Sequence, residues 1–156
     1  MTAMDWLMWA PLVAASLHMF EEFLVPGGFL AWYRGYRPDP SRISRRFLAI
    51  VNAALLVVCC NIALLGRRPV GIAYWLAISA LLCSNGIWHA WASYRSRTYS
   101  PGVVTGVAIY VPLAVFGYSY FVRSGAASIG TAALACAIGG SYPFWSAAYH
   151  GLFRKG

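Results

Sequence analysis

Three ionisable side chains lie close together in an otherwise apolar segment near the start of the chain. They are His18, Glu21 and Glu22, within the sequence LHMFEEF. In an α-helix, positions i, i+3 and i+4 share one face, so all three can point in one direction. Such groups cost about 2.5–3.5 kcal/mol each inside a membrane span, and they are usually retained for function. We therefore expect a functional site here; the alternative is that both glutamates are simply solvated at the membrane surface.

The other two histidines of the chain are predicted to lie at a similar depth. His89 and His150 each fall near the end of an apolar segment, shortly before a basic residue. At a rise of about 1.5 Å per residue, both lie within roughly 10 Å of their helix ends. Asn85 precedes His89 by one helical turn, and Trp88 lies beside them. An amide can orient a carboxylate or a water, and an indole can stabilise a cation, so we expect all these side chains to share one site.

The composition indicates which kind of fold must position these residues. The 156 residues are 60% hydrophobic and only 10% charged, with a mean hydropathy of +0.62. A soluble globular protein carries about 25% charged residues, so this chain cannot cover a folded surface with polar groups. The composition excludes an ordinary cytosolic enzyme, a disordered protein and a disulfide-stapled secreted domain. Its net charge of +8 does not indicate nucleic acid as a partner, because the basic residues lie in gaps between apolar segments.

Five apolar segments are long enough to cross a bilayer, which takes about 20 helical residues. They cover residues 4–24, 46–65, 71–94, 102–122 and 128–152. After the first, Phe29, Trp32 and Tyr33 lie among arginines, a mixture typical of the membrane interface. We predict an all-α, polytopic membrane helical bundle forming a single domain over residues 1–156, with five transmembrane helices plus a short interfacial segment after helix one. That segment is either an anchor or a lid over the site.

The distribution of basic residues predicts the orientation of the bundle. The gaps after the first and third segments and the C-terminal tail hold Arg34, Arg37, Arg42, Arg45, Arg46, Arg95, Arg97, Arg154 and Lys155. The gaps on the opposite side hold only Arg67, Arg68 and Arg123. Positively charged residues accumulate on the cytoplasmic side of a membrane. The N-terminus is therefore expected outside and the C-terminus in the cytoplasm.

Three short sequence elements follow one another along the chain. They are the motif HxxEE at residues 18–22, a second histidine at His89 and the letters YSPG at residues 99–102. This ordered set, over residues 15 to 102, resembles the HXXEE family of small bacterial integral membrane proteins. The resemblance implies a location in a bacterial inner (cytoplasmic) membrane and supports the choice of site residues. The family has no established activity, so the resemblance leaves the chemistry open.

The YSPG element also has a structural interpretation. Pro101 favours the first position of a helix, and Ser100 can cap the backbone N–H groups that follow. Tyr99 is placed to form a hydrogen bond near the site. Gly102 and Gly106 have the GxxxG spacing, which lets another helix approach closely. We expect this face to be available for a homodimer.

The leading hypothesis is a metal-dependent membrane enzyme. The expected metal ligands are His18, Glu22, His89 and His150. The expected catalytic residues are Glu21, Glu22, Asn85 and Trp88. Imidazole and carboxylate ligands suit zinc or iron and leave an open position, and the second glutamate can act as a general base or orient a ligand. Which glutamate faces the site stays open, since a helix rotation of about 100° exchanges them. The substrate is expected to be a lipid, isoprenoid or other hydrophobic small molecule, with membrane lipids as neighbours.

Two other classes of function are also compatible with these residues. One is a metal-free isomerase or terpene-cyclase-like enzyme, in which a protonated glutamic acid activates an olefin or epoxide. Trp88 and Trp32 would then stabilise a carbocation. The other is a proton or metal-ion carrier or sensor with a His/Glu relay. Against a carrier, the sequence shows no inverted repeat and no second polar layer toward the outer half.

Overall fold

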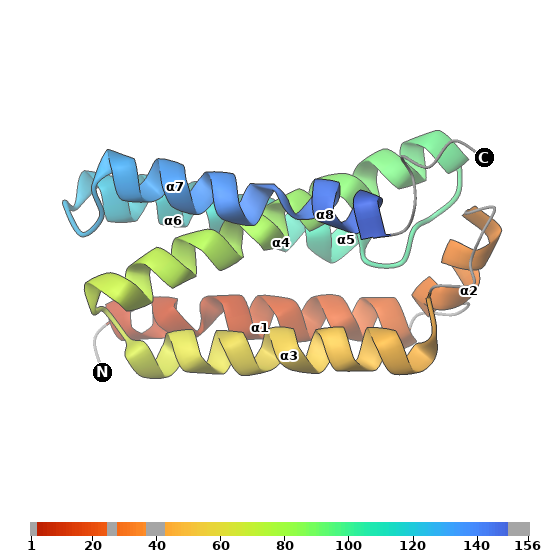
Figure 1. The fold of residues 1–156 in the computed structure, drawn as a ribbon, viewed down its shortest axis with the longest axis horizontal. Helices are drawn as coiled ribbons and strands as arrows, with labels where there is room; N and C mark the ends of the chain where they lie inside the picture. Colours follow the sequence, from red (N-terminus) through yellow and green to blue (C-terminus); the bar gives the residue numbers. More distant parts are fainter. Residues whose placement is uncertain (1–2, 25–27, 37–42, 150–156) are drawn as a thin grey trace.

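The computed structural model describes residues 3–24, 28–36 and 43–149 (Figure 1). Every regular element within these ranges is helical, which confirms the all-α prediction. The elements are α1 (Ala3–Leu24), α2 (Gly28–Tyr36), α3 (Arg45–Leu65), α4 (Pro69–Ser96), α5 (Val103–Thr105), the π-helical turn η2 (Gly106–Tyr110), α6 (Val111–Arg123), α7 (Ile129–Gly140) and α8 (Tyr142–Tyr149).

Three helices are long and apolar enough to cross a membrane: α3, α4 and the continuous helix Val103–Arg123, which comprises α5, η2 and α6. A helical membrane bundle is therefore confirmed, but five spanning helices are not. α1 has 22 residues but is not among these three, and it carries Asp5, Glu21 and Glu22. The segment predicted to span over 128–152 divides into α7 and α8, of 12 and 8 residues, and its last three residues lie outside the described ranges. The division follows from Gly139, Gly140 and Pro143, which are poor in a helix interior.

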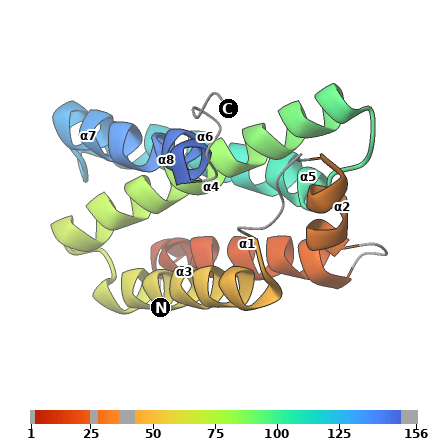
Figure 2. The ribbon, with the colours of Figure 1, turned by 45° about the vertical axis from the view of Figure 1, so that its right-hand side comes forward.

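α4 is the central helix of the bundle. α1 and α3 lie side by side in one layer, α6 and α7 form the other, and α4 crosses between them (Figures 1 and 2). The C-terminal ends of α1 and α4 and the N-terminal ends of α3 and α5 meet at one end of the bundle, next to α2. We call this the site end, because every predicted site residue that the structure describes lies toward it.

A buried tryptophan holds the opposite end of the bundle together. Trp75 on α4 donates a hydrogen bond of 2.9 Å from its indole nitrogen to the Leu7 carbonyl of α1. Its ring packs edge-on against Phe121 of α6 at a centroid distance of 5.2 Å. Gly117 makes room for it, because a Cβ there would lie 2.0 Å from the indole ring. These contacts fix α4 relative to α1 and α6, and thereby set the positions of these helices at the site end.

The GxxxG spacing is used inside one chain. A Cβ on Gly86 of α4 would lie 2.5 Å from the Gly106 carbonyl oxygen, and a Cβ on Gly106 would lie 2.7 Å from Gly86 Cα. This contact brings the backbones of α4 and η2 together, as small residues do between membrane helices. Gly102 and Gly106 are both buried. The close approach that this spacing allows is therefore made here between α4 and η2, and a homodimer through this face stays a prediction.

Candidate functional site

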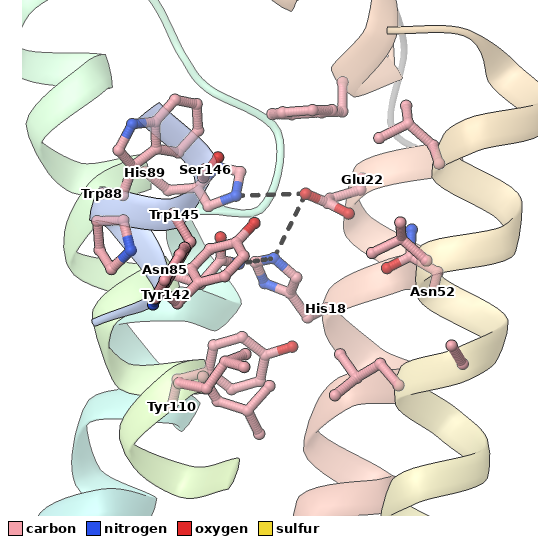
Figure 3. A pocket seen from close by; sticks show the side chains of 18 of the residues that line it. His18, Glu22, Asn52, Asn85, Trp88, His89, Tyr110, Tyr142, Trp145 and Ser146 are labelled. Atoms are coloured by element: carbon pink, nitrogen blue, oxygen red, sulfur yellow. Dashed lines mark hydrogen bonds and ion pairs between the residues drawn. The ribbon is translucent and has the colours of Figure 1, made fainter. Parts of the chain in front are cut away.

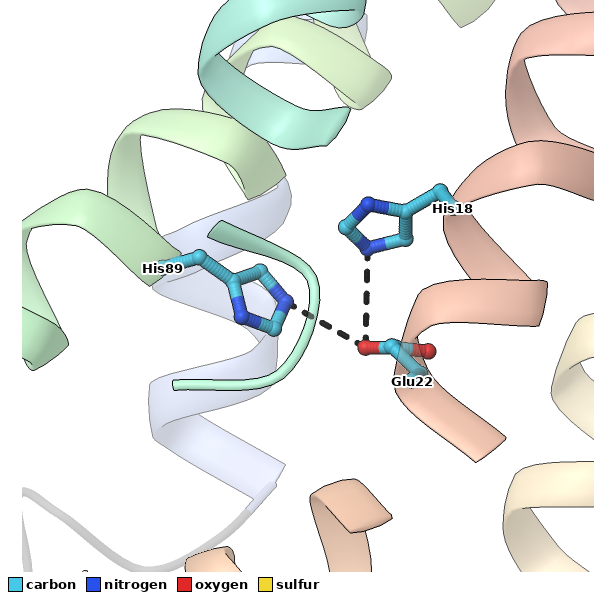
Figure 4. Close-up of side chains that lie close together, drawn as sticks. All are labelled: His18, Glu22 and His89. Carbon is cyan, nitrogen blue, oxygen red and sulfur yellow. Dashed lines mark ion pairs between the residues drawn. The ribbon is translucent and has the colours of Figure 1, made fainter. Parts of the chain in front are cut away.

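Two histidines and a glutamate meet where α1 passes α4 at the site end (Figure 4). His18 and Glu22 lie one turn apart on α1, and His89 reaches toward them from α4. Glu22 Oε1 lies 3.5 Å from His18 Nε2 and 3.3 Å from His89 Nε2. All three side chains are buried, and their nearest nitrogen and oxygen atoms lie within 4.8 Å of one another. We call these three residues the His–Glu–His cluster.

The separations of Glu22 from the two histidines are closer to those of ligands on one metal ion than to those of direct hydrogen bonds. A hydrogen bond between a charged nitrogen and a carboxylate usually measures about 2.7–2.9 Å, which is shorter than either separation here. Ligand atoms about 2.0–2.2 Å from one tetrahedral zinc ion lie roughly 3.3–3.6 Å apart. Imidazole nitrogen and carboxylate oxygen are also ligands that zinc and iron accept. The cluster can therefore hold a divalent cation and leave a position for water or substrate.

Hydrogen bonds on the far side of each imidazole direct its Nε2 atom into the cluster. His18 Nδ1 lies 2.8 Å from Thr105 Oγ1, and His89 Nδ1 lies 3.0 Å from Ser100 Oγ. The Thr105 hydroxyl has a single proton and donates it to Glu21 Oε2 at 2.5 Å. Its oxygen can then only accept the proton of His18 Nδ1–H. With its proton on Nδ1, His18 turns the Nε2 lone pair into the cluster, where it accepts a hydrogen bond from Asn85 Nδ2 at 3.2 Å and where a metal ion would bind it.

Glu21 is turned away from the cluster and caps the helix that follows the YSPG element. Its carboxylate accepts hydrogen bonds from the Tyr99 hydroxyl, from Val104 N–H at 3.1 Å, and from Thr105 N–H at 2.7 Å. These N–H groups have no partner within their own helix, and a negative charge is favourable there. Partial burial and the neighbouring carboxylate raise the pKa of Tyr99 to about 12, so the phenol stays protonated and keeps donating. Of the two glutamates that the sequence could not tell apart, Glu22 faces the cluster and Glu21 lies behind it.

The YSPG element wraps around both imidazoles. Gly102 has a positive φ of 99°, and a Cβ on it would lie 2.7 Å from His18 Cε1 and 3.0 Å from His89 Cε1. The Ser100 hydroxyl bonds His89, and its backbone N–H donates to Ser93 Oγ at 3.0 Å. Ser100 therefore orients a histidine instead of capping the next helix, and the predicted cap comes from a glutamate of α1. The role predicted for the hydroxyl of Tyr99 as a hydrogen-bonding group near the site is confirmed.

A cavity of about 480 Å³ opens beside the cluster (Figure 3). It lies between α1 and α3 on one side and α4 and α8 on the other, and most of its lining is apolar. Asn85 Nδ2 lies 3.2 Å from His18 Nε2, and the Trp88 ring meets the His89 ring edge-on at 5.0 Å. Asn52 of α3 also lines the cavity. The cluster thus forms one polar wall of a largely apolar chamber.

α2 covers the cavity at the site end. Phe29 and Tyr33 are buried and line the cavity, and the Phe29 ring lies 5.4 Å from the His89 ring. Trp32 is not part of the lining, and its indole nitrogen donates to Thr98 Oγ1 at 2.9 Å. The predicted interfacial segment is therefore a short helix placed over the site, as a lid would be. Trp32 therefore lies outside the cavity, whereas the carbocation hypothesis expected it at the site.

The structure brings most of the predicted site residues together. The cavity is lined by His18, Glu22, Asn85, Trp88 and His89. Glu21 supports it from behind through the Thr105 hydroxyl. His150 lies outside the described ranges, so its role as a ligand stays a prediction. His18 and His89 were inferred to lie at a similar depth from their distances to their helix ends. This similar depth allows the two side chains to meet.

Several polar residues of the site escaped the sequence reasoning, namely Thr105, Tyr110, Tyr142 and Ser146. Tyr110 is buried, with its ring 4.6 Å from the His18 ring. Helical periodicity held a signal for two of them, because Gly102, Thr105 and Gly106 share one face and Tyr110 lies one turn further. This face was interpreted as a contact surface for another helix, and Thr105 and Tyr110 were therefore overlooked.

Comparison with known proteins agrees with the motif. The family model described as "protein of unknown function with HXXEE motif" matches residues 9–117. The matched range includes the whole His–Glu–His cluster, the YSPG element and Thr105, and it ends before α7. No curated protein and no solved structure gives a significant match. The chain therefore belongs to the HXXEE family.

Proposed function

We propose that this protein is an integral membrane enzyme that uses zinc or iron to act on a hydrophobic small molecule. The observation that carries the proposal is the convergence of His18 Nε2, His89 Nε2 and Glu22 Oε1, all buried, at metal-ligand spacing beside a largely apolar cavity. Three protein ligands with a free position are the usual arrangement of a catalytic zinc site. A lipid, an isoprenoid or a similar apolar molecule matches the lining.

The residues around the cluster have separate roles in this proposal. A metal in such a site polarises a substrate oxygen or activates a water molecule. Thr105, held by Glu21, keeps the His18 proton on Nδ1 and its lone pair toward the ion. The Asn85 amide donates to His18 Nε2 at 3.2 Å, and with a metal ion on that nitrogen it would instead donate to an oxygen bound at the open position. Trp88 packs against His89 and keeps bulk water away from it.

Metal content tests the proposal directly. In untagged, detergent-purified protein, inductively coupled plasma mass spectrometry is expected to find about one zinc or iron per chain, as in a three-ligand site. In His18→Ala and His89→Ala, the metal content is expected to fall below about 0.1 ion per chain, because each substitution removes one of three ligands. Ser79→Ala is the matched control, since Ser79 is equally buried on α4 but bonds only the Leu76 carbonyl. Wild-type protein that holds no metal after loading with zinc or ferrous iron would overturn the metal proposal.

A metal-free enzyme working through carbocations is the second candidate, and the aromatic rings at the site favour it. Trp88 lies 6.2 Å from the Phe29 ring and 6.3 Å from the Tyr33 ring, all at the covered end of the cavity. Aromatic faces stabilise a cation when water is excluded. Glu22 would then donate a proton and a histidine would take one back. This candidate expects no bound metal and full loss of turnover of an isoprenoid olefin or epoxide in Glu22→Gln.

We further propose that the site end faces the cytoplasm of a bacterial inner membrane, with the N-terminus outside. Arginines gather at the site end, namely Arg34, Arg45, Arg46, Arg95 and Arg97, against Arg67, Arg68 and Arg123 at the other end. This asymmetry is what the positive-inside rule describes. In a variant lacking the native cysteines, a membrane-impermeant maleimide added to spheroplasts is expected to label Arg68→Cys and not Arg97→Cys. The opposite labelling would reverse the orientation.

A further inference from the structure

We propose that the cavity binds a lipid with a single aliphatic chain and a small oxygen-bearing end. The polar end lies at the His–Glu–His cluster, and the chain runs along α3 and α4 toward the middle of the bundle. The lipid enters sideways between α3 and α8. This inference names the substrate class of the site proposed above, and it rests on that proposed function for the chemistry at the polar end.

The cavity is polar at one end and apolar along its length. On α4 its lining extends from His89 back to Ile78, a distance of about 16 Å at 1.5 Å per residue. On α3 the lining extends over a similar length, from Phe47 to Val58. Past Asn52 and Asn85, the lining residues of these two helices are all apolar: Ala54, Leu55, Val58, Ile78, Leu81 and Leu82. The length is about half of a hydrocarbon core of roughly 30 Å, which is the depth of one leaflet.

The mouth of the cavity faces the hydrocarbon core of the membrane. Lining residues that are also exposed mark the mouth: Val51, Ala54 and Val58 on α3, with Val51 at 43% and Val58 at 42%, and Trp145 on α8, at 73%. α3 is the most apolar of the three candidate spanning helices, and most of it faces outward. Val51 lies at the end of its first third and Val58 at the end of its middle third. A mouth at that depth admits molecules dissolved in the bilayer and excludes water-soluble ones.

The size of the cavity fits one chain. At about 30 Å³ per methylene-sized group, as for a water molecule in the liquid, a cavity of about 480 Å³ holds roughly 16 such groups. This volume matches one chain and is small for the two acyl chains of a phospholipid. The polar end must also be small, because Phe29, Tyr33 and Ile43 form a buried apolar cluster over the site end. A linear chain and an isoprenoid chain share this chemistry.

Photo-crosslinking can test this assignment with a 16-carbon alcohol that carries a diazirine at its far end. The protein is reconstituted in phosphatidylcholine nanodiscs, and intact and peptide mass spectrometry report the labelled fraction and position. We expect adducts on residues 54–58 and 78–82, the apolar part of the cavity on α3 and α4, which we call the slot. Excess hexadecanol or excess farnesol is expected to reduce labelling several-fold, and the stronger competitor distinguishes a linear chain from an isoprenoid. Excess two-chain lipid is expected to have no effect.

Variants at the mouth and at the far end make the test specific. Val58→Trp is expected to lower labelling at least about fivefold, because an indole overfills the mouth. Its matched control is Val57→Trp, the neighbouring residue on α3, which is 60% exposed and outside the lining. Ile78→Trp shortens the slot and is expected to shift the preference from the 16-carbon probe to a 10-carbon one, which a folding defect does not do. Equal labelling of the Val57 and Val58 variants, or competition by two-chain lipid, would overturn the inference.

The experiment separates the lipid inference from the metal proposal. The aliphatic chain contacts α3 and α4 beyond the cluster, so metal-free wild-type protein is expected to keep at least half of the labelling. Labelling of the slot in a protein that binds no metal would leave the lipid assignment standing and remove the metal. A bound metal without slot labelling would do the reverse.

Discussion

Glu22→Gln is expected to abolish metal binding and any metal-dependent turnover, whereas Glu21→Gln is expected to weaken both only partly. Glu22 supplies the one carboxylate oxygen that lies near both imidazoles, and a neutral amide is a poor ligand for zinc or iron. Glu21 contacts no ligand atom directly and acts on His18 through the Thr105 hydroxyl. Loss of such a second partner typically costs about 10–100-fold in metal affinity.

The same two variants are expected to differ in stability. In metal-free protein, Glu22→Gln replaces a buried carboxylate, which lies 3.3 and 3.5 Å from the two histidines, with a neutral amide that can donate to their nitrogens, so the apparent melting temperature is expected to stay the same or rise. Glu21→Gln turns one of the two acceptor oxygens into an amide nitrogen, so either the donors of Tyr99 and Val104 or the two donors of Thr105 lose their acceptor. Each unsatisfied buried donor costs about 1–3 kcal/mol. Its melting temperature is therefore expected to fall.

Zinc titration against a chromophoric chelator and thermal unfolding in detergent measure the two effects. Each variant is first checked for a single gel-filtration peak. These adjacent glutamates are a matched pair, because the substitution is identical and the residues differ only in the direction of their side chains. Complete metal loss in Glu21→Gln with retention in Glu22→Gln would reverse the assignment of the two residues. Equal loss of metal binding in both variants would mean that the cluster depends on the Glu21–Thr105 contact as strongly as on its own ligand Glu22.

The sequence was sufficient to predict that His18, Glu22 and His89 lie close together, because helix periodicity and membrane hydropathy depend only on residues near one another in the sequence. His18 and Glu22 share a face by spacing alone, and His89 has a similar depth because its helix ends at a known distance. The direction of Glu21 was not predictable in the same way. It depends on the unpaired N–H groups of Val104 and Thr105, which reach α1 only after the bundle has assembled.

Two other features depended on contacts that sequence spacing does not specify. Gly102 and Gly106 indicate a close approach, but the spacing does not say whether the partner lies in the same chain, and here Gly86 takes that place. The last helical segment was predicted as one span because its hydropathy is continuous. Its division at Ser141 reflects local backbone preferences of glycine and proline, which average hydropathy ignores.

Gly102→Ala is expected to damage the site as severely as removing a ligand, although Gly102 bears no functional group. The added Cβ would lie 2.7 Å from His18 Cε1, 3.0 Å from His18 Nε2 and 3.0 Å from His89 Cε1. Both imidazoles are held from behind by hydroxyl groups of Thr105 and Ser100, so neither can move away freely. The left-handed backbone adds about 1–2 kcal/mol for a residue with a Cβ, and overpacking adds about 1–3 kcal/mol.

Gly125→Ala separates the two contributions, because Gly125 also has a positive φ, of 71°, but no atom within 4 Å of the added Cβ. Both variants are expected to lose stability through backbone strain, measured as thermal midpoints of metal-free protein. Only Gly102→Ala is expected to lose more than this and to raise the Kd for zinc by more than about tenfold, since it displaces two ligands of one ion. Identical behaviour of the two variants would mean that Gly102 is needed for its backbone angle alone. A larger effect at Gly102 would show that the YSPG element is part of the site, with its glycine setting how closely the two imidazoles approach.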